Sequence, residues 1–132
     1  MTTSLWGELP EITEIRTPKV VLAEQAKALQ EMTQGSLTCE LTSTPNADGI
    51  MHVMRMVAPS LGNYSVVLVI LTHQAKAYPC KIESPFVGFS GKKCDDETRL
   101  EAALKFFLQH AKTRELIGNL LQQIRADKSI AA

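Results

Sequence analysis

The sequence predicts a single α+β domain in which a four-stranded antiparallel meander carries helices on one face. Apolar residues near the N-terminus follow a helical period, which changes at residue 36 to the period of two that is typical of strands. The chain has 132 residues, the length of one ordinary domain. We expect an extended N-terminal arm over residues 1–17, the domain over residues 18–126 and a frayed tail over residues 127–132.

The first helix is expected to begin at Pro18, with Thr17 as its N-terminal cap. A threonine oxygen accepts from the free N–H groups of the first turn, and proline at the first helical position gives up a hydrogen bond that would not form there. An apolar stripe continues to Gln34, and Gly35 is the residue type that ends helices. Gln25 lies within that stripe, where we expect its amide to contact a neighbouring backbone rather than a ligand.

Four segments with strand patterns follow the helix. Residues 37–42 alternate apolar and polar side chains, and turn-forming residues at 45–49 lead into a second strand that starts at Ile50. The third strand, residues 64–72, contains an unbroken apolar run, whereas the fourth, residues 78–83, alternates and holds a proline that favours a sheet edge. We therefore expect the strand order 1-2-3-4, with strands two and three inside.

Two helices are predicted at the C-terminal end, after a glycine-bearing loop over residues 84–94. Thr98 and Glu101 have the spacing of a capping box, and Thr113 is expected to cap the last helix, which ends near Ala126. Each helix has one apolar face, so both are expected to pack on the same side of the sheet as the first helix.

Composition excludes several functional classes. Fourteen basic residues balance fourteen acidic ones, so the broad positive surface of a nucleic-acid binder is not expected. The three cysteines, Cys39, Cys80 and Cys94, are widely spaced, which favours reduced thiols in the cytoplasm. No signal-peptide pattern is seen, and the apolar run of the third strand is too short for a bilayer, which needs about 20 residues. We therefore expect a cytoplasmic protein without a membrane partner.

Residues with chemical potential do not form a recognisable catalytic or metal-binding pattern. The histidines lack metal-site spacing, and no serine or cysteine stands in a nucleophile motif. If Ala58 pairs with Tyr64, His52 and His73 are offset by about three residues across strands two and three. We therefore expect no cofactor, metal or catalytic residue. A second alternative places an enzyme pocket near His73 and the loop after it, with Tyr64 or Cys80.

Gly91, Lys92 and Lys93 stand before a predicted helix. The order of helix, strand meander and helix is similar to that of the double-stranded-RNA-binding domain, and these three residues resemble that family's basic loop. The resemblance implies that Lys92 and Lys93 contact an anion or a nucleic-acid backbone. The chain departs from the family in its fourth strand, its acidic helix start and its zero net charge, so duplex RNA binding is kept as the alternative function.

The sheet face turned away from the helices is expected to have an apolar centre with a polar rim. The candidate contact residues there are Met51, Val53, Val57, Val67 and Val69, and the expected rim residues are Thr38, Glu40, Thr42, Lys81 and Glu83. Exposed apolar patches usually mark contact sites, and methionine adapts readily to partners. We therefore predict a non-enzymatic interaction or regulatory module that forms a homodimer or binds a protein partner.

Two large aromatic residues outside the predicted core, Trp6 and Phe106, are added to this candidate surface. The arm that holds Trp6 is expected to be held against the domain by Trp6, Leu9, Ile12 and Ile15. The arm or the C-terminal helix of the same chain would then cover the open face. In the alternative, the arm reaches a partner subunit.

Overall fold

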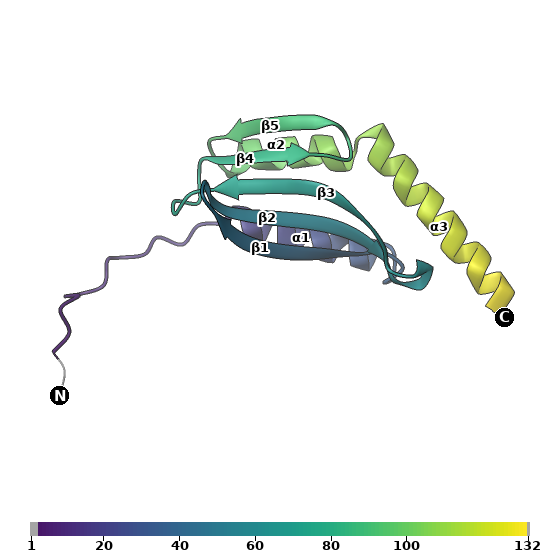
Figure 1. Ribbon diagram of the computed structural model, residues 1–132, viewed down its shortest axis with the longest axis horizontal. Coiled ribbons are helices and arrows are strands. Elements are labelled where there is room, and N and C mark those ends of the chain that lie inside the picture. The colour runs from purple at the N-terminus through teal and green to yellow at the C-terminus, as the bar shows by residue number, and fades with distance from the viewer. Residues whose placement is uncertain (1–2, 132) are drawn as a thin grey trace.

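The computed structural model describes residues 3–131, so residues 1–2 of the predicted arm and residue 132 of the predicted tail lie outside it. In chain order the elements are α1 (Pro18–Met32), β1 (Thr38–Asn46), β2 (Gly49–Ala58), the short η1 (Pro59–Leu61), β3 (Tyr64–His73), β4 (Cys80–Ser84), β5 (Phe89–Cys94), α2 (Glu97–Leu108) and α3 (Ala111–Ala131). The strands form one antiparallel sheet in the order β1-β2-β3-β4-β5, with α1 and α2 behind it (Figure 1). The predicted α+β domain with an N-terminal helix, a meander and two C-terminal helices is confirmed.

The sheet has five strands rather than the predicted four, because β5 replaces part of the expected loop over residues 84–94. Cys94 pairs with Cys80 across β4 and β5. The sequence hides this strand because Gly91 interrupts its pattern. The flexible side chain of Lys81 lies over Gly91, in the space that a Cβ atom there would occupy.

The first helix begins as predicted. The side-chain oxygen of Thr17 accepts a hydrogen bond from the backbone N–H of Val20 at 3.3 Å. The helix ends at Met32, after which Gly35 has a φ of 81° and donates its N–H to the carbonyl of Gln30 at 2.8 Å. This positive φ is the conformation for which glycine was expected at this position.

The starts of α2 and α3 differ from the predictions. Asp96, not Thr98, caps α2, because its carboxylate accepts from the backbone N–H of Arg99 at 2.9 Å. Thr113 lies inside α3 and does not cap it; its buried hydroxyl donates to the carbonyl of Phe107 at 2.8 Å and so joins the two helices.

The last helix continues to Ala131, beyond the predicted end at Ala126 and through most of the segment expected to be a frayed tail. No glycine or proline follows Gly118 in the described chain, and Lys128 lies in the last turn, where a positive charge is favourable to the helix dipole. Within residues 3–131, the helices lack the length and apolar character that a membrane span requires.

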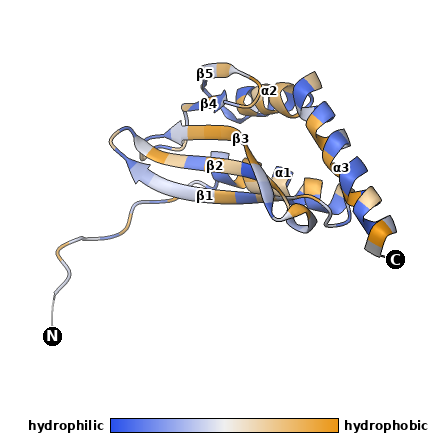
Figure 2. Ribbon diagram, turned by 45° about the vertical axis from the view of Figure 1, so that its right-hand side comes forward, coloured by the Kyte–Doolittle hydropathy of each residue, from blue (hydrophilic) through white to orange (hydrophobic). Residues whose placement is uncertain are grey.

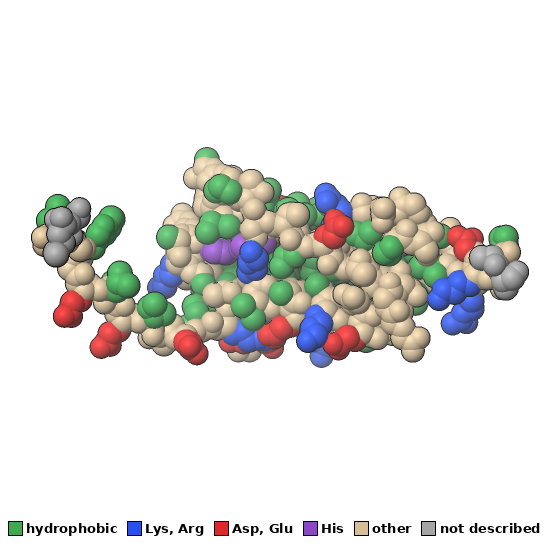
Figure 3. All heavy atoms as spheres, turned by 90° about the horizontal axis from the view of Figure 1, so that it is seen from below, with side chains coloured by type: hydrophobic (Ala, Val, Ile, Leu, Met, Phe, Trp, Pro, Cys, Tyr) green, Lys and Arg blue, Asp and Glu red, His purple; other side chains and the backbone are tan. Residues whose placement is uncertain are grey.

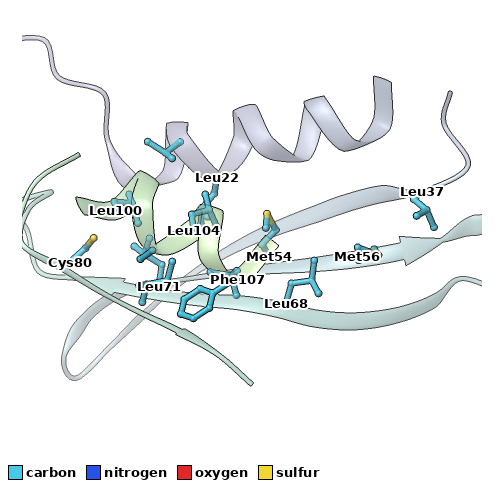
Figure 4. Packing of buried hydrophobic residues seen from close by; sticks show 14 of the residues in the cluster. Leu22, Leu37, Met54, Met56, Leu68, Leu71, Cys80, Leu100, Leu104 and Phe107 are labelled. Atoms are coloured by element: carbon cyan, nitrogen blue, oxygen red, sulfur yellow. The ribbon is translucent and has the colours of Figure 1, made fainter. Parts of the chain in front are cut away.

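The hydrophobic core lies between the helices and one face of the sheet. Leu22 of α1 and Phe107 of α2 point toward Met54 and Leu71 of the sheet (Figure 4). Figure 2 shows that β3 is strongly hydrophobic through its middle, in agreement with its unbroken apolar run. The helices therefore cover one face of β2 and β3, and the other face is free of helices.

The arm is extended, but it does not lie on the domain (Figure 1). Trp6, Leu9 and Ile12 are 90%, 85% and 87% exposed, and Ile15 is 56% exposed. The prediction that these side chains hold the arm against the domain is therefore wrong. Beyond Arg16 the arm continues away from the domain, which leaves these side chains largely in solvent.

Only the base of the arm is attached to the domain, through Arg16. Its guanidinium group contacts Glu24 at 2.7 Å, Glu97 at 2.6 Å and also Glu101, and the Tyr78 hydroxyl donates to its carbonyl at 2.8 Å. The hydrogen bond from Arg16 lowers the pKa of the Glu24 carboxyl below its usual range. These contacts fix the start of the arm on the helix side of the sheet.

Candidate interaction face of the sheet

One irregularity in the β2–β3 ladder determines which side chains reach each face. Met54 pairs with Val69, but the next residue, Arg55, pairs with Val67, so Leu68 is an extra residue in β3. Side chains in a strand alternate between the two faces, and one inserted residue therefore reverses the face of every residue beyond it. This β-bulge divides the ladder into two halves.

On the near side of the bulge, the predicted pairing of Ala58 with Tyr64 is confirmed. On the far side, Val69 turns into the helix-covered core and is fully buried, so its predicted position on the open face is wrong. Ile70 takes that position instead, opposite Val53 of β2. The physical reason is the inserted residue, which a regular period of two cannot anticipate.

The open face has an apolar centre, by which we mean Met51, Val53, Val57, Val67 and Ile70. Arg55, between Val53 and Val57 in β2, projects to the same face. Val57 is buried by its neighbours, and the other four are partly exposed. In Figure 1 the strands stand in front of α1 and α2, so this face points toward the viewer without a helix over it. Four of the five predicted centre residues, all except Val69, therefore lie where they were expected.

A polar rim surrounds the apolar centre. Thr38, Glu40 and Thr42 of β1 pair with open-face residues of β2, as predicted for the rim. On the other side, Lys81 and Lys93 pair with each other across β4 and β5. Together with Lys76 of the β3–β4 connection they line a shallow cavity of about 500 Å³, and we call these three residues the lysine margin.

Lys92 and Lys93 do not lie in a loop, as the resemblance implied, but in β5. They are consecutive strand residues and project to opposite faces of the sheet. Lys93 belongs to the open face and lies 3.6 Å from a carboxylate oxygen of Asp95, whereas Lys92 pairs with the inward-facing Ile82. The two lysines therefore do not form one basic loop.

Phe106 and Trp6, which were added to the candidate surface, lie away from the open face. Phe106 is on α2 and 51% exposed, with its ring centre 5.0 Å from that of Phe89 and 5.8 Å from that of His110. It belongs to an aromatic cluster beside β5. Trp6 lies in the detached arm.

A hydrogen-bonded chain of side chains connects β1, β2 and β3 near one end of the sheet. Ser43 Oγ lies 2.7 Å from His52 Nδ1, the two histidine Nε2 atoms are 2.8 Å apart, and His73 Nδ1 donates to the carbonyl of Gln74 at 2.6 Å. Because a carbonyl can only accept, neutral His73 carries its proton on Nδ1 and accepts from His52 Nε2. Burial, and then the charges of His73 and Lys19, lower the pKa of His52.

The sequence did not predict the hydrogen bond between His52 and His73. The bulge shortens their offset along the strands and places both rings on the same face, because His52 lies opposite Leu71 and His73 opposite Ile50. Two imidazoles at hydrogen-bonding distance share one proton between them, which suits a neutral, structural pair. In the described part of the chain, no group of three or more histidine, cysteine or acidic side chains is arranged to hold a metal ion.

The cysteines lack the environment of a reactive thiol. Burial raises the pKa of Cys39 to about 11 and that of Cys80 to about 12, so the thiolate form is suppressed at neutral pH. Cys80 pairs with His73, as an enzyme pocket there would need, but Tyr64 lies at the opposite end of β3. Of the two residues suggested beside His73, Cys80 is therefore its neighbour and Tyr64 is not.

A second concave surface lies on the helix side, between α1 and α3. It has a volume of about 470 Å³ and is lined mainly by apolar residues, including Leu29, Met54 and Ile117. Gln25 also lines this surface, and its amide makes no hydrogen bond within residues 3–131, so the expected backbone contact is not found.

Comparisons with protein-family models, curated proteins and solved structures found no match for this chain.

Proposed function

We propose that this protein is an interaction module that self-associates through the open face of its sheet. The observation that carries the proposal is the apolar centre of that face, which no element of the described chain covers. An antiparallel sheet with helices on one side normally presents alternating polar residues to water on the other. Here Met51, Val53 and Val57 occupy three of those positions in β2, and Arg55 occupies the position between the two valines.

The distribution of polar groups on the open face also supports a contact surface. Stable interfaces have a centre depleted of charge and a polar, accessible rim. The open face has such a rim, with threonines along β1 and the lysine margin along β4 and β5. Arg55 is the charged residue within the centre, and it pairs with Glu40 of β1. A two-fold axis parallel to the face would turn the open faces of two copies toward each other, and two-fold dimers are the commonest symmetric oligomers.

Light scattering on the purified chain tests the proposal with one disruptive variant and one matched control. Val53→Glu places a charge in the apolar centre, whereas Ala23→Glu places it on the exposed outer side of α1, between Lys19 and Lys27. We expect a dimer for the natural chain and for Ala23→Glu, and a folded monomer for Val53→Glu. A natural chain that is monomeric at all concentrations, or an unchanged Val53→Glu dimer, would contradict the proposal.

A further inference from the structure

The arm has two sets of side chains, each repeated at every third residue. The apolar set is Trp6, Leu9, Ile12 and Ile15, and the acidic set is Glu8, Glu11 and Glu14. In Figure 3 the acidic side chains lie along one side of the arm and apolar side chains along the other. The arm is therefore amphipathic, although it contains neither a helix nor a strand.

The three-residue repeat indicates the backbone conformation in which the apolar side chains of the arm would lie on one side and contact a single surface. A strand would place Leu9 on the face opposite to Trp6 and Ile12, so adding the arm to a sheet edge would bury only part of the set. A helix is disfavoured by Pro10 and by Gly7, whose φ is 71°. From residue 8 onward, an extended polyproline-type chain has three residues per turn, which aligns Leu9, Ile12 and Ile15 in one row and the glutamates in another. Gly7 lies between Trp6 and this regular segment.

The open face has an apolar region beside a basic one, which matches the apolar row beside the acidic row of the arm. Its apolar centre lies on β2 and β3, and its lysine margin lies along β4 and β5. Neighbouring strands are about 5 Å apart, so the two features are separated by roughly 5–10 Å. An arm lying on the face can therefore set its apolar row on the apolar centre while its glutamates approach Lys76, Lys81 and Lys93.

The size of the open face also indicates that a further segment takes part. The five strands have between 5 and 10 residues, which gives a face of roughly 500 Å² from the usual strand spacing and rise. Stable complexes bury about 800 Å² on each partner. Covering Trp6 and three aliphatic side chains of an arm adds on the order of 400 Å², which brings the contact into that range.

We infer that the arm of each copy lies across the open face of a second copy, with Trp6, Leu9 and Ile12 on the apolar centre and the glutamates toward the lysine margin. The inference rests on the proposed self-association and names the segment that completes it. Arg16 fixes the base of the arm on the helix side of its own sheet, and the arm continues away from the domain (Figure 1). Mutual exchange of arms gives a closed two-fold dimer.

The single tryptophan of the chain makes the inference directly measurable. Trp6 is 90% exposed in the separate chain and would be covered in the exchanged dimer, so its emission should shift to shorter wavelength as concentration rises and the mass doubles. Leu9→Glu in the arm should abolish the shift and lower the mass to that of a monomer. Thr13→Glu, at an exposed position outside both rows, is the matched control and should leave both unchanged.

A mixing experiment distinguishes a second copy from the chain's own face. One chain carries Val53→Glu, which keeps Trp6 as the fluorescent probe but blocks the chain's own open face. The other carries Trp6→Phe, which keeps the open face intact but removes the tryptophan emission. We expect the emission of the first chain to shift when the second is added in excess. No shift is expected when the added chain carries both Trp6→Phe and Val53→Glu.

The outcomes separate this inference from the proposed function. A dimer that Val53→Glu dissociates but Leu9→Glu leaves intact, with Trp6 emission unchanged, overturns the role of the arm and retains self-association through the face. A shift in the natural chain that is absent from the mixture assigns the arm to its own face and overturns exchange. Charge reversal by Lys81→Glu in the accepting chain should weaken the mixed contact by about 2- to 5-fold.

Discussion

The two faces of the β2–β3 pair differ in their cover, although both are apolar. On one face, Met54, Val69 and Leu71 are almost completely buried under α1 and α2. On the other, Val53, Val67 and Ile70 have nothing over them and remain partly exposed. The comparison shows that apolar composition identifies inner strands but does not identify what covers each face. The helices account for one face, and the other is available to a second chain.

The largest difference between the faces is expected in stability, at two adjacent positions of β3. Leu71 is fully buried, so Leu71→Ala should lower the free energy of unfolding by about 2–5 kcal/mol through lost burial and a cavity. Ile70→Ala, on the open face, should lower it by less than about half of that amount, since its side chain is already partly hydrated. Urea denaturation of the monomer at low concentration measures both, and equal losses would contradict the assignment of the faces.

An intermediate effect is expected at the bulge that separates the two halves of the ladder. The buried hydroxyl of Ser84 donates to the carbonyl of Leu68, the inserted residue, at 2.6 Å. Ser84→Ala leaves that carbonyl without its partner and should cost about 1–3 kcal/mol. Ser90→Ala, at an exposed position, is the control and should change stability by less than about 0.5 kcal/mol. Equal stability of the two variants would show that the hydroxyl does not support the bulge.

The smallest effect is expected from the histidine pair on the covered face. The folded-state pKa of His52 lies below the ordinary value of 6.5, so the unfolded chain binds a proton first as the pH falls. The stability that the folded state gains with neutral His52 is therefore complete above about pH 6.5. It is lost as the pH falls from there toward the lowered pKa of His52. Thermal melts between pH 7.5 and pH 5 should show this loss in the natural chain and a smaller one in His52→Gln. Identical pH dependences would remove His52 as the cause.

The order of the elements could be predicted from the sequence because local signals carry it. Thr17 with Pro18 marks the first helix start, and Gly35 its end. The alternation in β1 also placed the rim residues correctly, since a period of two is maintained along that strand. These features depend on residues that are neighbours in the chain.

The remaining features depend on contacts that no local pattern contains. The insertion of Leu68 is supported by Ser84 from another strand, and it moves Val69 inward while bringing His52 and His73 together. Gly91 obscured β5 because a glycine interrupts the strand pattern, and the Lys81 side chain that lies over it comes from another strand. The arm's apolar residues were expected to be buried against the domain, but the arm extends away from it.

The proposed function requires that association takes place through the open face of the sheet and not through another surface of the chain. Ile70→Lys tests it most directly, because Ile70 lies at the apolar centre and its new ammonium group would stand beside Glu83, its cross-strand neighbour, without disturbing the core. Sedimentation velocity should show a monomer for Ile70→Lys, with the circular dichroism of the natural chain, and a dimer for the natural chain. A natural and a variant chain that sediment identically as dimers would contradict the account.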